Sequence, residues 1–390
     1  MRLLAATTAN DGHAGPLLTF VRACAAAGHE VAVAAPASYA DRLAPSGFTH
    51  MPFADAPPEL IGPIMARLPE LGFEQANATV VREVFGRIDA QAALPGVADA
   101  IAVWRPDLVL REPAELGSLA AAVAAGTPLA RVSIGVQEMD RYVTALVHEP
   151  LIELGELAGL PGSSLADAAA GETCLSLVPE SLDRAGDPDY HDGRVTARFR
   201  DSPAPRGTGS TPQSFGDPEL PLVYVTFGSV AGALPPFAGV FRAALDAFAD
   251  DEVRVFMTVG RAVDVEGLGP IPANAHVVPW WPQDEVLRYA DVMLGHGGFG
   301  TTYGALARGV PQVVAPLFTS DQVANGRHVA AAGFGRTVEP GDDVVGRAAV
   351  EVRRVLADPA AGDSARAGAR EVAALPPVAD AVRLLGALAD

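Results

Sequence analysis

Short apolar strands alternate with helices along most of this chain, and this rhythm restricts the possible fold more than any other feature. In the first half, apolar runs predict strands at 2–7, 30–35, 107–110 and 129–133. Helical patterns separate them, at 16–27, 94–103 and 116–125. Continuous apolar strands that alternate with helices are typical of a parallel sheet covered on both faces. Segments 55–90 and 140–170 interrupt the rhythm, and we expect them to shape a substrate pocket.

The same rhythm restarts in the second half. Residues 206–221 are rich in Pro, Gly and Ser, which predicts a linker. Strands are predicted beyond it at 223–227, 253–259, 276–279, 292–294 and 312–315. We therefore predict the α/β class, with two Rossmann-like doubly wound domains, at 1–205 and 222–375, that face a cleft. The amphipathic segment 376–390 predicts a C-terminal helix that packs back on the N-terminal domain.

Composition limits the partners and the compartment. The chain has 28 Lys+Arg against 47 Asp+Glu, a net charge of −19, which disfavours binding to nucleic acid or anionic membranes. No apolar run approaches the ~20 residues that span a bilayer. Cys24 and Cys174 form no CxxC pair, and reduced core thiols suit a cytoplasmic protein. We expect a cytoplasmic protein with small-molecule partners, and a homodimer is left open.

A glycine-rich turn follows one of the predicted strands and opens a helix. Gly295, Gly297 and Gly300 match G-x-G-x-x-G, and Asp321 follows about 20 residues later, as in a dinucleotide-binding fingerprint. Free N–H groups and the helix dipole at such a start favour phosphate. The spacing keeps a nicotinamide-dependent oxidoreductase as an alternative. Against it, the motif lies in the second half, and a side chain, His296, sits in the phosphate turn.

The turn after the first strand contains a candidate general base, His13. Histidine is the side chain best matched to taking up a proton near neutral pH. The alternative is a turn histidine that bonds the backbone. A carboxylate that orients the imidazole would strengthen such a base. Glu112, just after the strand at 107–110, is the first choice for this carboxylate and Glu115 the second, although both could equally be solvated loop acids.

Two other strand ends carry groups that suit a nucleotide. A Gly228-Ser229 turn offers a hydroxyl and an N–H to a phosphate, or is an ordinary strand-to-helix turn. Trp280 and Trp281 are adjacent and point in different directions, so we expect at most one of them to stack on a planar base; the alternative is core packing.

Two acidic pairs have the spacing with which a metal ion could hold a diphosphate. They are Asp187 with Asp189, and Asp264 with Glu266. Neither follows a strand that ends in the predicted cleft. We therefore predict no metal site.

Together these elements resemble the family 1 glycosyltransferases of GT-B fold, the nucleotide-sugar-dependent group that decorates natural products. The resemblance covers nearly the whole chain. It rests on Trp280-x-Pro282-Gln283, His296-Gly297-Gly298-Phe299-Gly300-Thr301-Thr302, Gly309-Val310-Pro311, Asp321-Gln322 and Asn325. The His-Gly-Gly-Phe-Gly-Thr-Thr form, in place of a plant-type His-Cys-Gly-Trp, is similar to the antibiotic-tailoring branch.

The resemblance implies an acceptor-binding N-terminal domain and a nucleotide-sugar-binding C-terminal domain. It implies His13 as the base, with Glu112 where many relatives have Asp. The donor-binding residues that it implies are Gly228, Ser229, Trp280, Gln283, His296, Gly297, Gly298, Gly300, Thr301, Asp321 and Gln322. In that set Trp280 stacks on the base, His296 and the N–H groups of 297–301 hold the diphosphate, and the residues at 321–322 bind sugar hydroxyls.

The implied reaction is an inverting, metal-independent transfer of a sugar or deoxysugar to a hydrophobic natural-product aglycone such as a polyketide. Gly304 stands where many members have a ribose-binding Glu, which favours a thymidine diphosphate (dTDP) donor because that donor lacks the 2′-hydroxyl. No cofactor is implied beyond the nucleotide sugar, which is a co-substrate. A catalytically silent, transferase-like partner protein is the second alternative.

Overall fold

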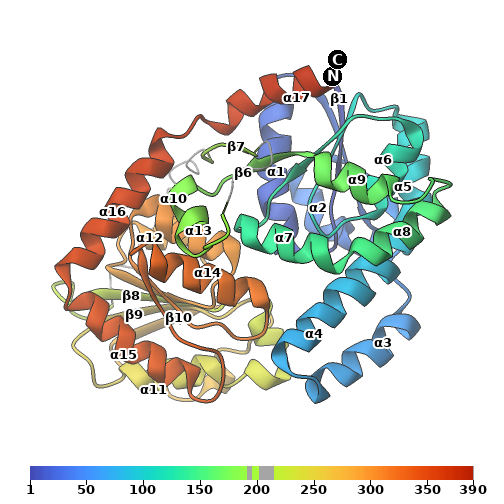
Figure 1. Cartoon of the computed structure of the whole chain (residues 1–390). Helices are drawn as coiled ribbons and strands as arrows, with labels where there is room; N and C mark the ends of the chain where they lie inside the picture. Colours follow the sequence, from blue (N-terminus) through green and yellow to red (C-terminus); the bar gives the residue numbers. More distant parts are fainter. Residues whose placement is uncertain (191–195, 202–214, 390) are drawn as a thin grey trace. The chain divides into compact units, whose positions relative to one another are not determined.

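The computed structural model describes residues 1–190, 196–201 and 215–389. Contacts divide them into two units. The first comprises 1–177, 196–201 and 376–389, and the second comprises 178–190 and 215–375. Both are α/β units (Figure 1).

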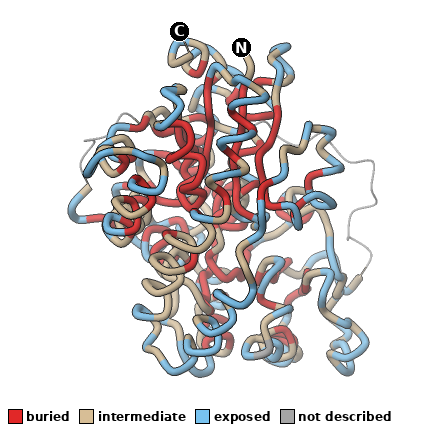
Figure 2. The backbone as a smooth tube through the Cα atoms, turned by 90° about the vertical axis from the view of Figure 1, so that its right-hand side faces the viewer, coloured by how far each residue is buried: buried red, intermediate tan, exposed pale blue. Residues whose placement is uncertain are grey.

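The first unit is built on a seven-stranded sheet in the order β3-β2-β1-β4-β5-β6-β7, and every pair in it is parallel. The strands are β1 Arg2–Ala6, β2 Glu30–Pro36, β3 Thr49–Phe53, β4 Leu108–Arg111, β5 Leu129–Val132, β6 Thr173–Ser176 and β7 Thr196–Arg198. In Figure 2 the buried residues, drawn red, lie in the interior, and exposed residues, drawn pale blue, lie on the outer helices and loops. The inner strands β1, β2, β4, β5 and β6 are largely buried, whereas the edge strands β3 and β7 are not. A sheet buried on both faces needs apolar side chains at successive positions, and β1 and β2 supply them.

Helices connect these strands. They are α1 Asp11–Ala26, α2 Ala40–Leu43, α3 Pro58–Arg67, α4 Phe73–Thr79, α5 Ala90–Trp104, α6 Gly117–Ala125, α7 Gln137–Leu146, α8 His148–Leu157, α9 Ser164–Gly171 and α17 Ala381–Ala389, together with a π-helix, η4, at Val80–Asp89. One core cluster joins β1, β2 and β4 to α5 and α6 through residues such as Leu4, Val97 and Val109. The C-terminal α17 contacts α1, so it belongs to the first unit.

The second unit has a six-stranded parallel sheet in the order β10-β9-β8-β11-β12-β13. Its strands are β8 Leu222–Thr226, β9 Arg254–Thr258, β10 Ala275–Val278, β11 Val292–Gly295, β12 Gln312–Val314 and β13 Gly335–Thr337. Its helices are α10 Glu180–Ala185, α11 Val240–Phe248, α12 Gln283–Leu287, α13 Phe299–Arg308, α14 Ser320–Ala331, α15 Val344–Leu356 and α16 Pro359–Ala374.

Alternate side chains of β8 enter two separate cores. Val223 and Val225 pack in a cluster with residues of α11 and α15. Leu222 and Tyr224 pack in another cluster with residues of α12 and α13. Helices therefore cover both faces of this sheet, and the predicted fold class, two doubly wound parallel-sheet units, is confirmed.

The structure differs from the sequence predictions in several places. It adds β3, β6, β7 and β13, which are short strands at or near sheet edges with little apolar sequence to reveal them. Segment 178–190, predicted within the N-terminal domain, belongs to the second unit. There α10 packs on α14, where His328 Nδ1 lies 2.7 Å from the Leu182 carbonyl oxygen. Much of the predicted linker, at 206–214, lies outside the described residues.

Candidate active site

His13 lies in the first turn of α1 and not in a turn before the helix. The helical pattern predicted a helix start at Pro16, but α1 begins at Asp11. Asn10 caps it, because the Asn10 side-chain oxygen accepts a hydrogen bond from the Gly12 N–H at 2.8 Å. Pro16 lies inside α1, one turn beyond its start, so the intrahelical hydrogen bond from residue 16 to the Gly12 carbonyl is absent.

His13 and Glu112 lie together in the first unit, although they are 99 positions apart in the sequence. His13 Nδ1 is 3.3 Å from Glu112 Oε2, and 3.2 Å from the Thr8 hydroxyl. The pairing of β1 with β4 aligns Ala6 with Arg111, so the residues that follow both strands become neighbours. With Nδ1–H directed at the carboxylate, Nε2 is the ring nitrogen that would accept a proton.

Glu112 is an ionised carboxylate held in place on several sides. It is fully buried, and its oxygens accept N–H donors from Thr8 at 3.1 Å and from Ala114 at 2.7 Å. Burial alone would raise the pKa of Glu112, but the charge and hydrogen bond of His13 and these two N–H groups hold it below its ordinary value. Such a carboxylate can stabilise an imidazolium on His13.

Arg111 fixes the turn that carries Glu112. Its guanidinium forms a bidentate pair with Glu172, at 2.7 and 2.5 Å, and both side chains are buried. Arg111 Nη1 also donates to the carbonyl oxygens of Glu112 and Glu115, at 3.1 and 3.3 Å. This pair could not be predicted, because nothing in the local sequence indicates that residue 172 would lie beside residue 111.

Glu115, the second candidate, is buried but does not contact His13 in any hydrogen bond or ion pair that the described residues show. Its Oε2 accepts the Ser118 N–H at 2.9 Å, and its buried Oε1 has no partner among them. Burial raises the pKa of Glu115, and the negative charge of Glu112 adds to this rise. Of the two candidates, the structure places only Glu112 beside the imidazole.

Two residues that the sequence analysis did not single out lie near His13. The Phe85 ring contacts the His13 ring with centroids 5.7 Å apart. Asp89 lies four residues after Phe85 on η4 and is partly buried. Its burial, and to a smaller extent the negative charge of Glu112, raise the pKa of Asp89 to about 6, although the charge of His13 lowers it. π-Helices are rare and often mark functional sites, but a sequence gives little sign of them.

His296 occupies a tight cage in the second unit. It follows β11, it is 9% exposed, and its buried Nδ1 has no partner within the described part of the chain. A Cβ on Gly228 would lie 2.7 Å from His296 Cε1, and one on Gly298 would lie 2.5 Å from Nε2. Burial lowers the pKa of His296 to about 4, so the imidazole is neutral at pH 7.

The turn between His296 and α13 requires glycine at residue 297. Gly297 has φ +90°, and a Cβ there would lie 2.7 Å from the Gln322 carbonyl oxygen. Asn325 Nδ2 donates to the Gly297 carbonyl oxygen at 2.8 Å and holds the turn. The Thr301 N–H donates to the Gly298 carbonyl oxygen at 3.1 Å, so this N–H, expected to face a diphosphate, is satisfied inside the turn. The N–H groups that remain available to an anion are therefore those that precede Thr301.

Asp321 and Gln322 lie in the first turn of α14, after β12. The Gln322 side chain is 3% exposed, and its Oε1 accepts the N–H groups of Leu317 and Phe318, at 2.8 and 3.1 Å. The side-chain oxygen of Gln322 therefore holds the loop that contains Leu317 and Phe318. Only the amide N–H groups of Gln322 remain for a sugar hydroxyl.

The two tryptophans point into different surroundings, as expected for neighbours in an extended segment. Trp280 is 54% exposed. Trp281 packs edge-on against Phe256, with ring centroids 5.9 Å apart, in a core cluster of the second unit. Trp280 is therefore the one that is available for stacking on a base.

Gln283 and Gly304 are in direct contact. Gln283 Nε2 donates to the Gly300 carbonyl oxygen at 3.2 Å, and a Cβ on Gly304 would collide with that same nitrogen. Residue 304 is thus small because the Gln283 amide covers it.

The two acidic pairs form turns. The Asp187 side chain accepts the Asp189 N–H, and the Asp264 side chain accepts the Glu266 N–H, each at 3.1 Å. Across the described residues, no three His, Cys, Asp or Glu side chains gather as they would around a metal ion. No helix among them is both long enough and apolar enough to cross a bilayer.

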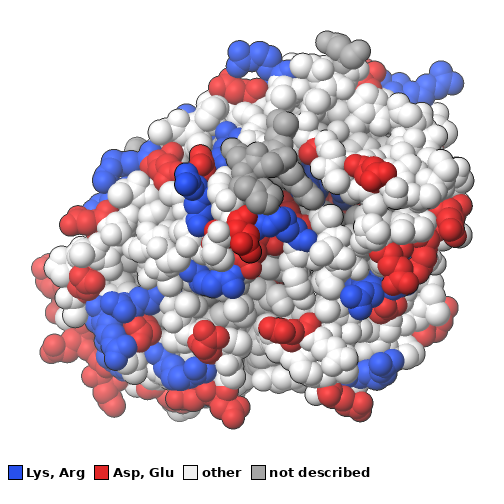
Figure 3. All heavy atoms as spheres, viewed as in Figure 1, with Lys and Arg blue, Asp and Glu red and all other residues white. Residues whose placement is uncertain are grey.

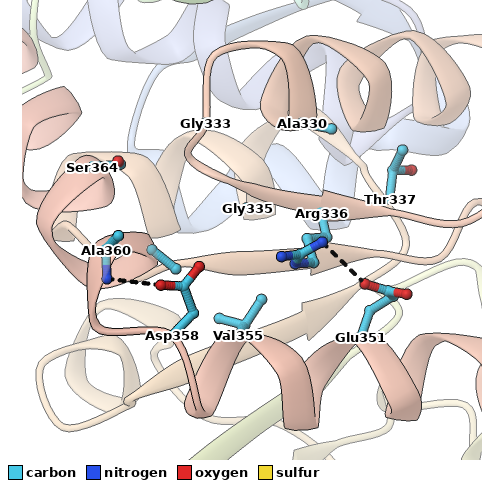
Figure 4. A pocket seen from close by; sticks show the side chains of 11 residues that line it. Ala330, Gly333, Gly335, Arg336, Thr337, Glu351, Val355, Asp358, Ala360 and Ser364 are labelled. Atoms are coloured by element: carbon cyan, nitrogen blue, oxygen red, sulfur yellow. Dashed lines mark hydrogen bonds and ion pairs between the residues drawn. The ribbon is translucent and has the colours of Figure 1, made fainter.

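Charges of both signs are interspersed on the face drawn in Figure 3. A cavity of about 510 Å³ in the second unit lies near the start of β13, where Arg336 pairs with Glu351 at 3.6 Å (Figure 4). None of the donor residues implied by the resemblance lines it. Those residues follow the carboxyl ends of β8, β10, β11 and β12 instead, where open α/β sheets bind ligands.

The fold and these two groups of residues define a GT-B glycosyltransferase. The chain matches both domain models of the erythromycin biosynthesis protein CIII-like family, the N-terminal one over residues 22–196 and the C-terminal one over 242–388. The chain therefore belongs to this family and is a glycosyltransferase of the type that tailors antibiotics with nucleotide sugars.

Individual relatives agree. The chain is 28% identical over 372 residues to L-demethylnoviosyl transferase of Streptomyces niveus, covering 92% of this chain and 90% of that protein. It is 28% identical over 411 residues to TDP-daunosamine transferase DnrS of Streptomyces peucetius, which covers 96% of this chain and 93% of that protein. The solved structure of spinosyn rhamnosyltransferase SpnG is 25% identical to this chain, with a TM-score of 0.79, and the match covers 99% of this chain and 100% of SpnG. SpnG has also been solved complexed with thymidine diphosphate.

Proposed function

We propose that this protein transfers a sugar or deoxysugar from a dTDP-sugar to a hydroxyl of a hydrophobic natural-product acceptor, with inversion and without a metal ion. The observation that carries the proposal is the contact between His13 and the buried carboxylate of Glu112. It supplies an oriented base in a unit that is separate from the nucleotide-binding residues.

In the proposed reaction, His13 Nε2 takes the proton of the acceptor hydroxyl as that oxygen attacks the anomeric carbon. The bond from this carbon to the diphosphate oxygen breaks, and the diphosphate leaves with the electron pair. Attack from the opposite face inverts the configuration through an oxocarbenium-like transition state. Charge that grows on the diphosphate is stabilised by the α13 start beside neutral His296.

Two observations support a dTDP donor. Gly304 offers no carboxylate for a ribose 2′-hydroxyl, and the Gln283 amide already fills the space beside it. The name of the relative DnrS specifies a TDP-sugar, and SpnG binds thymidine diphosphate in its crystal. The metal-independent character is supported by the two acidic pairs, because Asp187 and Asp264 each use one carboxylate oxygen to close a local turn.

The hydrophobic acceptor is supported by the first unit. Helix α3 has no buried residue, and its Leu60 and Met65 side chains are 53% and 47% exposed. The Phe85 ring lies against the base itself. Apolar side chains at this density suit a ligand with a large apolar surface, such as a polyketide.

The test is thermal unfolding with dTDP, UDP, their sugars and NADH. A ligand at 100 times its Kd stabilises by about 2.7 kcal/mol, and each 1 kcal/mol shifts the Tm of a domain of this size by about 2–4 °C. We expect a larger shift with dTDP than with UDP at equal concentration, and inverted product with a dTDP-sugar and a polyketide acceptor. Stabilisation by NADH alone would favour the oxidoreductase alternative. Binding without turnover for any acceptor would favour the catalytically silent protein.

A further inference from the structure

Arg261 lies over the exposed face of Trp280. Its guanidinium carbon is 4.8 Å from the centroid of the Trp280 ring, in a cation–π arrangement. Arg261 follows β9 at the start of the connection to β10, and the residue is exposed. It therefore sits beside the aromatic surface that is available to a nucleotide base.

The guanidinium has no acidic partner in the described part of the chain. No hydrogen bond or ion pair is formed by Arg261 there, whereas Arg288 and Arg308, in the same unit, both pair with Asp284. The sequence contains no lysine, so every permanent side-chain cation is an arginine, and the net charge is −19. Other exposed arginines, such as Arg22, also lack a carboxylate partner among the described residues, but Arg261 is the one whose guanidinium lies over Trp280.

The loop that carries Arg261 touches the turn expected to meet the phosphates. Gly260 has φ +89°, and a Cβ on it would lie 3.6 Å from the Gly228 carbonyl oxygen and 3.7 Å from that of Ser229. Arg261 thus extends from a backbone that is packed on the Gly228-Ser229 turn. The arginine is placed between the turn and Trp280.

We propose that Arg261 is a nucleotide-binding residue whose guanidinium binds the diphosphate of the donor, and that it rests on Trp280 when the site is free. This inference rests on the proposed function. His296 is neutral, and the α13 start offers N–H groups and a dipole, so Arg261 would add a full positive charge to these two groups. The planar guanidinium fork matches two phosphate oxygens.

The experiment measures the affinity of R261A and R261K for thymidine, dTMP, dTDP and UDP by calorimetry. We expect R261A to bind dTDP and UDP about 10- to 100-fold more weakly, the usual effect of losing a hydrogen-bonded charge. Its affinity for thymidine should stay within about 2-fold, because thymidine has no phosphate. R261K should fall between, because it keeps the charge and loses the fork. Added salt should weaken dTDP binding more in wild type than in R261A.

The matched control is R354A, which removes an exposed arginine from α15 and changes the net charge equally. It should bind all four ligands like wild type. Equal losses for thymidine and dTDP in R261A would show that Arg261 acts on the base, and unchanged dTDP affinity would show that it does not bind donor; either result overturns the proposal. If wild type binds neither dTDP nor UDP, the proposed function itself fails, which is a different outcome.

Discussion

Replacing Glu112 by Gln tests the proposed base most directly, because it removes the charge and keeps the shape. Glu112 Oε1 accepts the Thr8 N–H, and Oε2 accepts the Ala114 N–H and faces His13 Nδ1. In E112Q one carboxylate oxygen becomes an amide NH₂, which cannot accept a hydrogen bond. If the NH₂ takes the Oε1 position, one of these contacts is lost; if it takes the Oε2 position, two are lost. The orientation with the amide nitrogen at Oε1 therefore destabilises the protein less, and it leaves the Thr8 N–H without an acceptor.

The magnitudes follow from these contacts. One buried N–H without an acceptor costs about 1–3 kcal/mol, which lowers the Tm by about 2–12 °C. The imidazolium of His13 loses its counter-charge, so kcat should fall by about 10²–10⁴-fold. The stabilising effect of Glu112 is present above pH 4.5 and is lost as the pH falls through its lowered pKa. The stability difference between E112Q and wild type should therefore narrow in acid.

The assay is steady-state transfer from a dTDP-sugar, with dTDP affinity measured separately. The dTDP affinity should not change, because the donor residues lie in the other unit. E115Q is the matched control, since Glu115 lies in the same buried turn and has a raised pKa without touching His13. In E115Q the amide oxygen can keep the Ser118 N–H contact while the nitrogen takes the unpartnered Oε1 position, so E115Q should keep wild-type kcat and stability. A folded E112Q with wild-type kcat, or equal losses in the two variants, would refute the reasoning.

Three other predictions use the same assays. His13→Ala should lose about 10²–10⁴-fold in kcat and keep its dTDP affinity; full activity would remove the base assignment. Burial depresses the pKa of His296 to about 4 in the folded protein, against 6.5 in the unfolded chain. As the pH falls below 6.5, the unfolded chain therefore binds a proton at His296 before the folded protein does. The free energy of unfolding should drop by about 3 kcal/mol between pH 6.5 and pH 4. His296→Gln should lack this drop and bind dTDP more weakly, and an unchanged pH profile would contradict the buried neutral state. Gly304→Ala should displace Gln283 and weaken dTDP binding with a Tm near wild type, because better helix propensity offsets the lost hydrogen bond; unchanged binding would exclude Gln283 from the donor site.

The extent of sequence-based prediction differed between the two halves of the site. The turn with His296, Gly297 and Gly298 is contiguous in sequence, so its place after a strand and before a helix could be predicted. The His13 site joins residues that are about a hundred positions apart. Its existence could be proposed, but the choice between Glu112 and Glu115 could not be made. The Arg111–Glu172 pair could not be foreseen at all.

Local periodicity and composition by themselves determined that the chain forms strands and helices in alternation, in two repeating halves, with a glycine-rich helix start in the second. These features depend on neighbouring residues, and a sequence displays neighbours directly. Only the tertiary structure decided which carboxylate meets His13, that α10 packs in the second unit, and that Arg261 lies on Trp280. Those contacts depend on which strands pair and in which register, and long-range packing sets that choice.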